Sequence, residues 1–138
     1  MITIKKQEFV KLEDILHLYQ AVGWTNYTNQ PQMLEQALSH SLVIYLALDD
    51  DAVVGLIRLI GDGFSSVFVQ DLIVLPSYQR QGIGSLLMKE ALKDYKDAYQ
   101  VQLVTEETEK NLGFYRFMGF EILSTYDCTG MIWINREK

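Results

Sequence analysis

A short glycine-rich stretch, QRQGIG at residues 79–84, constrains this sequence more than any other feature. It follows the apolar run SVFVQDLIVL and precedes GSLLMKEALKDY, in which apolar residues recur at helical spacing. The first turn of a helix leaves backbone N–H groups unpaired, and glycine lets an anion approach them closely. The sequence therefore predicts a strand, a loop and a helix start that bind phosphate groups, with Gly82 and Gly84 allowing the approach.

The spacing separates this loop from two other phosphate-binding loops. A P-loop requires GxxxxGK followed by Ser or Thr, and no Lys-Ser or Lys-Thr pair follows a glycine here. A dinucleotide fingerprint requires a third glycine at position 87, where this chain has Leu87. The pattern that remains is QxxGxG directly after a strand.

A second motif, FYRFMGF at residues 114–120, lies far enough downstream for a helix, a strand and the start of another helix. Together, QxxGxG and FYxxxGF in this order resemble the acyl-CoA loop and a later helix of the GNAT superfamily of N-acetyltransferases. The resemblance covers nearly the whole chain and points to a small subgroup that includes plant plastid enzymes acetylating arylalkylamines and protein amines. Four further stretches carry it: VGWTNY (22–27), GLIRLIGDG (55–63), QDLIVLP (70–76) and GMIW (130–133).

The resemblance implies acetyl-CoA as cosubstrate and assigns it two sets of backbone contacts. Its pyrophosphate would lie on the loop amides, and its pantetheine arm on a strand that splays from its neighbour at a bulge. One N–H of that strand would polarise the thioester carbonyl. The pyrophosphate set is Gln79, at the first polar position of the motif, then Arg80, Gln81, Gly82, Ile83, Gly84 and Ser85; the pantetheine set is Leu72, Ile73 and Val74.

Two residues are candidates for catalysis. The resemblance places Tyr115 of FYRFMGF at the sulfur of coenzyme A, where a phenol could protonate the departing thiolate. An alkylamine with a pKa near ~10 is almost entirely protonated at pH 7, so the reaction also needs a proton acceptor. Some GNAT enzymes use a glutamate that corresponds to Phe68 here, which leaves Asp71 as the nearest carboxylate.

The role of Asp71 stays open at this level. An acid inside so apolar a strand needs a partner or a function, because an unpaired buried carboxylate is costly. It is either a base, or a group orienting a base water, or it forms a structural ion pair with Arg58 across the strands. Trp24 and Tyr27 likewise either line the acceptor pocket or belong to the core.

Composition narrows the class of protein. At 138 residues with 49% hydrophobic residues, the chain is expected to form one domain, residues 1–138, with its own core. With one cysteine and two histidines the chain is expected to hold no metal site, and a net charge of -6 argues against nucleic acid as a partner. The start lacks a signal-peptide h-region and no apolar run reaches ~20 residues, so we expect a cytoplasmic protein with no membrane partner.

Hydrophobic periodicity predicts an α+β fold in the order β-αα-βββ-α-β-α-ββ, which is also the order that the GNAT resemblance implies: a mixed, mostly antiparallel sheet flanked by helices. The expected strands are 2–6, 42–49, 52–60, 66–75, 101–105, 120–125 and 130–134. The expected helices are 12–22, 31–41, 82–95 and one that begins near Glu106 and closes at Gly119.

The function expected from these features is direct transfer of an acetyl group from acetyl-CoA to a primary amine in a ternary complex. The acceptor is a small molecule or a protein amine. The alternative is a CoA-binding regulatory or sensor module without turnover, and Tyr115 favours catalysis because a pure binder needs no proton donor at the sulfur. Transfer to a hydroxyl group also remains open. Pairing through the two terminal strands would produce a homodimer.

Overall fold

Five strands rich in β-branched and aliphatic residues form one sheet in the structure, a computed structural model that describes residues 1–137. The strands follow one another in the order β1-β2-β3-β4-β5; the first four are antiparallel, and β5 runs parallel to β4. This confirms the predicted α+β fold with a mixed, mostly antiparallel sheet. The strands are β1 (Ile2–Gln7), β2 (Val43–Asp49), β3 (Ala52–Gly61), β4 (Ser66–Val74) and β5 (Gln100–Leu103).

The chain forms two compact units, Met1–Leu103 and Val104–Lys138. The first contains the sheet, a short 3-10 helix (Pro76–Tyr78) and four α-helices: α1 (Leu12–Ala21), α2 (Thr25–Thr28), α3 (Pro31–Ser39) and α4 (Ile83–Asp94). The second contains α5 (Glu109–Phe117) and a short 3-10 helix, Leu123–Tyr126. The expectation that 1–138 is one domain stays a prediction.

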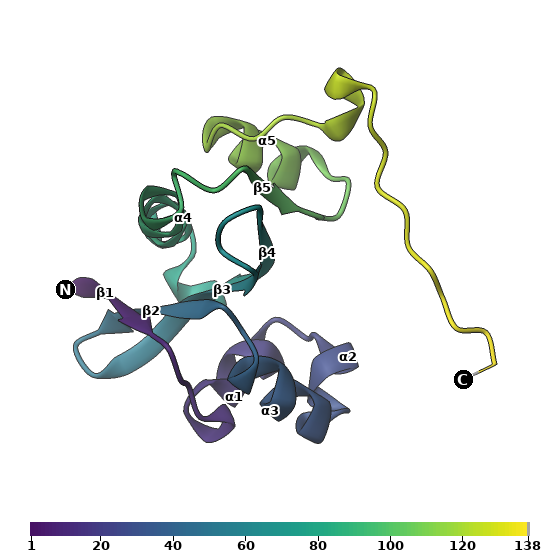
Figure 1. The fold of residues 1–138 in the computed structure, drawn as a ribbon. Coiled ribbons are helices and arrows are strands. Elements are labelled where there is room, and N and C mark those ends of the chain that lie inside the picture. Colours follow the sequence, from purple (N-terminus) through teal and green to yellow (C-terminus); the bar gives the residue numbers. More distant parts are fainter. Residues whose placement is uncertain (138) are drawn as a thin grey trace. The chain divides into compact units, whose positions relative to one another are not determined.

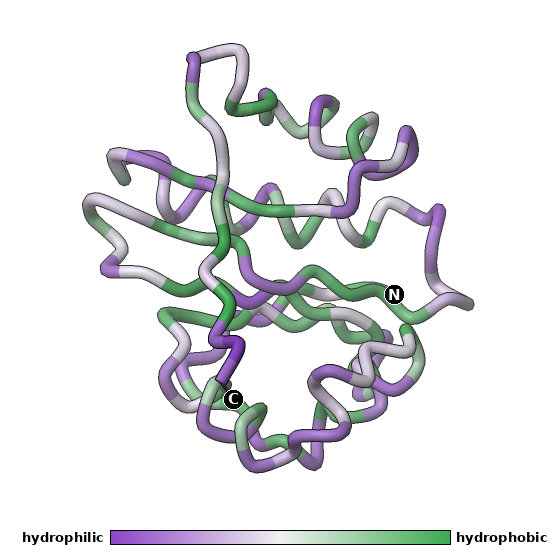
Figure 2. The backbone as a smooth tube through the Cα atoms, turned by 90° about the vertical axis from the view of Figure 1, so that its right-hand side faces the viewer, coloured by the Kyte–Doolittle hydropathy of each residue, from purple (hydrophilic) through white to green (hydrophobic). Residues whose placement is uncertain are grey.

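Helices cover both faces of the sheet in the first unit: α1, α2 and α3 lie on one side and α4 on the other (Figure 1). Side chains alternate between the faces of a strand, so Leu56 packs against α1 and α3 while its neighbour Gly55 lies beside Leu87 of α4. Because both faces are covered, β2 and β3 are buried along most of their length and mostly hydrophobic (Figure 2).

The start of the last helix differs from its prediction. α5 begins at Glu109 because the side chain of Thr108 caps it, accepting a hydrogen bond from the backbone N–H of Asn111 at 3.1 Å. Glu106 and Glu107 therefore precede the helix. The single-turn α2 was not predicted, because four residues are too few to produce a helical pattern.

The two strands expected at the end of the chain are not formed, which corrects the prediction for 120–125 and 130–134. The first segment closes on itself instead: the N–H groups of Thr125 and Asp127 donate to the carbonyls of Ile122 and Ser124. The second carries exposed apolar side chains, with Trp133 at 83% exposure. A strand forms only where a neighbour completes its hydrogen bonds, and periodicity does not specify that neighbour. The homodimer that would pair through these strands stays a prediction.

Among residues 1–137, the helices are all too short or too polar to cross a membrane.

Candidate functional site

The QxxGxG stretch forms the start of α4. Gly82 lies immediately before the helix at φ 80°, a left-handed conformation that suits glycine, and a Cβ there would meet nothing within 4 Å. The first hydrogen bond of the helix runs from the N–H of Leu86 to the carbonyl of Gly82 at 3.0 Å. The N–H groups of Ile83, Gly84 and Ser85 precede that bond and have no intrahelical partner. Together with the helix dipole, they favour an anion at this end of α4.

Side chains hold the loop that leads into α4. Gln79 donates from Nε2 to the backbone carbonyl of Val74 at 3.0 Å, which ties the loop to the end of β4. One residue earlier, the hydroxyl of Tyr78 donates to Asp49 Oδ2 at 2.6 Å, at the end of β2. Arg80 lies between these anchors and the helix at φ 65°, a conformation that non-glycine residues adopt rarely. The loop is therefore fixed to two strands of the sheet.

β4 carries a bulge near its centre. Arg58 of β3 pairs with Asp71 and the next residue, Leu59, pairs with Val69, so Gln70 is an extra residue without a partner in β3. β5 pairs with β4 only from Ser66 to Val69. Within the first unit, the edge of β4 beyond the bulge has no neighbouring strand.

Strand geometry determines which backbone groups lie on that free edge. The N–H of Leu75 donates to Val54 of β3 at 2.9 Å, and hydrogen-bonded pairs alternate along an antiparallel ladder. Ile73 therefore directs its N–H and carbonyl toward β3, whereas Leu72 and Val74 direct theirs to the free edge. Of the three residues predicted to bind pantetheine, two offer backbone groups to a ligand.

Asp71 is buried in a network of hydrogen bonds on the face covered by α1 and α2. The carboxylate is 3% exposed and forms an ion pair with Arg58, whose Nε lies 2.7 Å from Oδ2. Tyr19 of α1 donates its hydroxyl to Oδ2 at 2.7 Å, and Tyr27 of α2 donates to Oδ1 at 2.9 Å. Arg58 also donates to the hydroxyl of Ser41 at 3.2 Å. The ion pair with Arg58, one of the two roles expected for Asp71, is formed.

The phenols of this network are held in their neutral form. Burial raises the pKa of Tyr19 and of Tyr27, and the negative charge of Asp71 raises both further. Burial acts to lower the pKa of Arg58, but the charge and hydrogen bond of Asp71 outweigh it and the pKa is raised. At neutral pH both tyrosines therefore donate to Asp71, and Arg58 carries its charge.

Trp24 lies beside the network and packs against the core. Its ring centroid is 6.1 Å from that of Tyr19 and 6.2 Å from that of Tyr27, and the two tyrosine rings are 5.0 Å apart. Trp24 is half-buried. One aromatic cluster thus joins the core to the surface of α2. Trp24 packs against the core, as one of the two interpretations of its role expected, and the exposed part of its ring is accessible to a ligand.

Tyr115 belongs to the second unit, on α5. Its ring makes edge contacts with Phe114 at 5.1 Å and Phe120 at 6.0 Å between centroids, so all three aromatic residues of the FYxxxGF motif are in one cluster. Burial raises the pKa of the Tyr115 phenol, which keeps the hydroxyl protonated at neutral pH.

The structure brings several of the sequence-predicted residues together in the first unit. Leu72 and Val74 on the free edge lead directly into Gln79 and the loop, and Gln79 bonds back to Val74. Sequence reasoning missed Gln70 and the hydroxyl of Tyr19. Tyr19 fits the apolar face of its helix, so only its phenol group could have indicated a buried polar partner.

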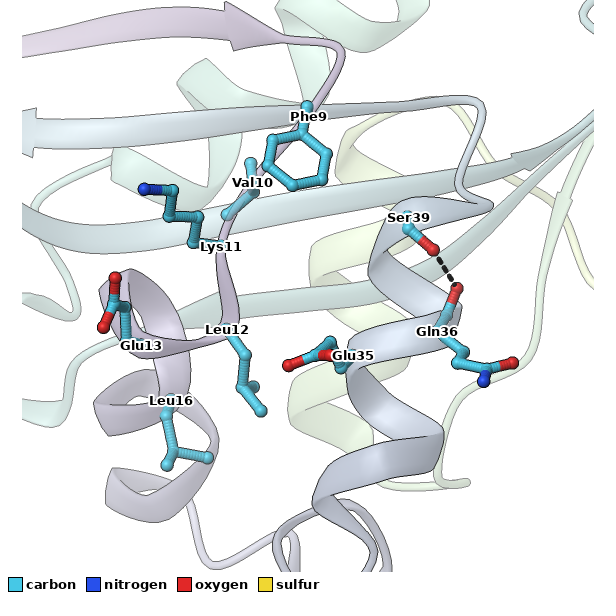
Figure 3. Close-up of a pocket in the computed structure, with 9 residues that line it drawn as sticks. All are labelled: Phe9, Val10, Lys11, Leu12, Glu13, Leu16, Glu35, Gln36 and Ser39. Carbon is cyan, nitrogen blue, oxygen red and sulfur yellow. Dashed lines mark hydrogen bonds between the residues drawn. The ribbon is translucent and has the colours of Figure 1, made fainter.

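A pocket of about 590 Å³ lies between the start of α1 and α3 (Figure 3). It contains none of the predicted site residues. Its lining combines apolar side chains with one lysine and two glutamates: Phe9, Val10, Lys11, Leu12, Glu13, Leu16, Glu35, Gln36 and Ser39.

Comparison with known proteins identifies the family. The model of the Acetyltransferase (GNAT) family matches residues 9–120, which is most of the chain. The chain belongs to the GNAT family of acetyltransferases. This membership confirms the resemblance seen in the two sequence motifs, and residues 79–85 and Tyr115 all lie within the matched range.

Individual GNAT relatives agree with this assignment. A GNAT acetyltransferase structure from Streptococcus pneumoniae TIGR4 is 87% identical, with a TM-score of 0.91 over 99% of both chains. Serotonin N-acetyltransferase 2, chloroplastic, of Oryza sativa subsp. japonica is 32% identical over 66% of this chain and 48% of its own length. GCN5-related N-acetyltransferase 1, chloroplastic, of Arabidopsis thaliana is 25% identical over 95% of this chain and 66% of its own length. The chain thus spans about half to two thirds of these two plastid proteins.

The buried ion pair leads to a prediction about stability. Arg58→Met leaves the Asp71 carboxylate buried without its cation, and breaking such a pair costs about 3–5 kcal/mol of unfolding free energy. Arg116→Met removes an exposed arginine at the end of α5 and should change stability by less than about 0.5 kcal/mol. Urea denaturation of both variants measures the difference. Equal stabilities would show that the pair does not hold the fold.

Proposed function

We propose that this GNAT protein transfers an acetyl group from acetyl-CoA to a primary amine by direct attack within a ternary complex. The observation that supports this most strongly is that two sets of unpaired backbone groups, one on β4 and one at the start of α4, follow each other directly along the chain. The free edge of β4 at Leu72 and Val74 runs into the loop and the unpaired amides at the start of α4. An extended arm that leads to a pyrophosphate, as the pantetheine arm of CoA does, matches this order of donors and acceptors.

The pyrophosphate of acetyl-CoA is assigned to the N–H groups of Ile83, Gly84 and Ser85, with Gln79, Arg80, Gln81 and Gly82 shaping the loop. Arg80 adds a positive charge that can pair with a phosphate oxygen. The pantetheine arm takes Val74 as its partner on the strand edge. The N–H of Leu72, one step closer to the bulge, then polarises the thioester carbonyl. Ile73 contributes by pairing with β3, which fixes the position of the strand edge.

The proposed chemistry assigns one role to each reacting group. The amine nitrogen attacks the thioester carbonyl carbon, the C–S bond breaks, and sulfur leaves with the electron pair. Asp71 receives the proton that the nitrogen loses, and Tyr115 donates a proton to the thiolate. No covalent enzyme intermediate is required. Trp24 offers an aromatic wall to the acceptor, which suits an arylalkylamine.

A panel of amines tests the function directly: each is incubated with the protein and acetyl-CoA, and the released CoA thiol is measured. The panel contains spermidine, phenethylamine, glucosamine, lysine and a peptide with a free N-terminus. We expect acetylation of at least one, with double-reciprocal plots whose lines intersect as a ternary complex requires, rather than the parallel lines of a covalent intermediate. Tight binding of acetyl-CoA without turnover on any amine would favour a CoA-binding regulatory module instead.

The phosphate site makes a prediction about two glycines. Gly82→Asp and Gly84→Asp each place bulk and negative charge where a phosphate should lie, so acetyl-CoA affinity should fall by about tenfold or more. Gly84 lies inside α4, so the loss there does not depend on the left-handed conformation of Gly82. Titration calorimetry measures both.

The control for these variants is Gly130→Asp, which adds the same charge at an exposed position of the second unit with nothing within 4 Å. It should bind acetyl-CoA as the unmodified protein does. If all three variants bound equally well, the phosphates would have to lie elsewhere.

Tyr115→Phe tests the proton donor. The change keeps the aromatic cluster with Phe114 and Phe120 and removes only the hydroxyl. Because thiolate departure then lacks its proton, turnover should fall roughly 10²-fold while acetyl-CoA affinity and folding stability stay unchanged. Phe114→Leu is the matched change in the same cluster and should leave the chemical step intact. Full turnover of Tyr115→Phe, in an assay limited by chemistry, would assign thiolate protonation to water.

A further inference from the structure

Asp71 cannot meet a substrate directly in this structure. Its side chain is almost fully buried, and both oxygens already accept hydrogen bonds. Oδ2 accepts from Tyr19 and Arg58, and Oδ1 accepts from Tyr27. A proton that travels from an amine to Asp71 must therefore pass through one of these three neighbours.

Only one of the three neighbours can both be reached by a substrate and accept a proton while donating its own. Arg58 has donors and no acceptor, and it keeps its charge at any physiological pH. Tyr19 is 0% exposed, so a substrate cannot reach its hydroxyl. Tyr27 is 9% exposed, and a phenol can accept a proton while donating its own.

The hydroxyl of Tyr27 already has a polar partner that comes from the surface. It accepts a hydrogen bond from Nε2 of Gln70 at 3.3 Å, and Gln70 is the exposed extra residue of the β4 bulge. Gln70 presents an N–H donor on a neutral nitrogen, which is also what an unprotonated amine presents. The bond is long, and the side chain is free to turn into solvent.

We propose that Tyr27 takes the proton from the acceptor amine and passes its own hydroxyl proton to Asp71, and that Gln70 holds the acceptor position on Tyr27 until the amine replaces it. The inference rests on the proposed acetyl transfer and names the group that contacts the nucleophile. Tyr27 is then a catalytic residue, and Asp71 acts through it.

The proton count closes in this scheme. The amine binds in its neutral form, and as the N–C bond forms and the C–S bond breaks, the nitrogen loses one proton to the Tyr27 oxygen, and Tyr27 loses one to Oδ1 of Asp71. Tyr115 supplies the proton of the CoA thiol. Solvent then removes the proton from Asp71 through Tyr27 and returns one to Tyr115, so the products are the acetamide and CoA thiol with no net change in the enzyme.

The charges around Tyr27 support this transfer. Nη2 of Arg58 lies 3.2 Å from the Tyr27 oxygen and stabilises negative charge there while the proton moves. The other titratable groups that face it are Asp71 on β4 and Tyr19 on α1, 5.0 Å away between rings. Burial keeps the Tyr27 phenol protonated at neutral pH, so it has a proton to give. The amide edge at Leu72, which receives the thioester, is next to Asp71 in the same strand.

Tyr27→Phe and Tyr19→Phe form a matched pair for the test. Both remove one hydroxyl that donates to Asp71, but only Tyr27 can contact the amine. With the panel amine that the unmodified protein acetylates fastest, Tyr27→Phe should lower kcat about 10²-fold at pH 7, and Tyr19→Phe should lower it only slightly. The deficit of Tyr27→Phe should shrink as pH rises, because a more basic solvent can take the proton that the relay otherwise removes.

Asp71→Asn and the double variant Tyr27→Phe/Asp71→Asn test whether the two residues act in series. The double variant should be no slower than the slower single variant, because either change interrupts the same path. If Asp71→Asn does not fold, the comparison of Tyr27→Phe with Tyr19→Phe decides alone. Equal rates for these two variants, or additive losses in the double variant, would overturn the relay.

Acetyl-CoA affinity separates this inference from the proposed function. Tyr27→Phe and Tyr19→Phe should bind acetyl-CoA as the unmodified protein does, since neither change touches the loop or the strand edge. If the Tyr27→Phe variant acetylates the amine at the full rate of the unmodified protein, the relay is refuted and the acetyltransferase assignment still stands. A protein that acetylates no amine refutes the proposed function first.

Discussion

The buried ion pair between Arg58 and Asp71 is the interaction on which the site depends. Removing two charges from water is costly, and the cost is offset here by hydrogen bonds from Tyr19, Tyr27 and the guanidinium, and by the contact with Ser41. These contacts join β3 and β4 to α1, to α2 and, through Ser41, to the segment that follows α3. The pair also lies directly beside the bulge of β4, so the same interaction fixes the helical layer and the place where the strand leaves its neighbour.

The bulge leaves part of β4 as a free strand edge, which is the candidate binding surface. Beyond Gln70, β5 no longer pairs with β4, and the N–H groups of Leu72 and Val74 are left without a partner strand. The hydrogen bond from Gln79 to Val74 and the anchor of Tyr78 on Asp49 then fix the loop at the end of that edge. One segment, from the bulge to the first turn of α4, therefore contains in succession the buried ion pair, the free strand edge and the glycine loop.

Sequence reasoning predicted the parts of the site that local chemistry determines. The loop and the start of α4 follow from glycines between a strand and an amphipathic helix, and Arg58 was the partner expected for Asp71 because it lies across the strands. The choice of Leu72 and Val74 over Ile73 required the register of β4, which depends on a bulge that no single residue type marks. The Tyr19 hydroxyl was hidden in an apolar helix face. The terminal strands 120–125 and 130–134 were predicted wrongly because a strand depends on a neighbour that its own sequence does not encode.

Amide hydrogen exchange followed residue by residue, with and without CoA, tests the central claim that one continuous backbone surface binds the cosubstrate. The account predicts that saturating CoA slows exchange at Leu72, Val74, Ile83, Gly84 and Ser85, which lack protein partners. Exchange at Ile73 should change less, because its N–H is already bonded to β3. Slowed exchange at α4 alone would leave the strand edge without a role. Unchanged exchange at all of these amides, under conditions where calorimetry shows CoA to be bound, would contradict the account.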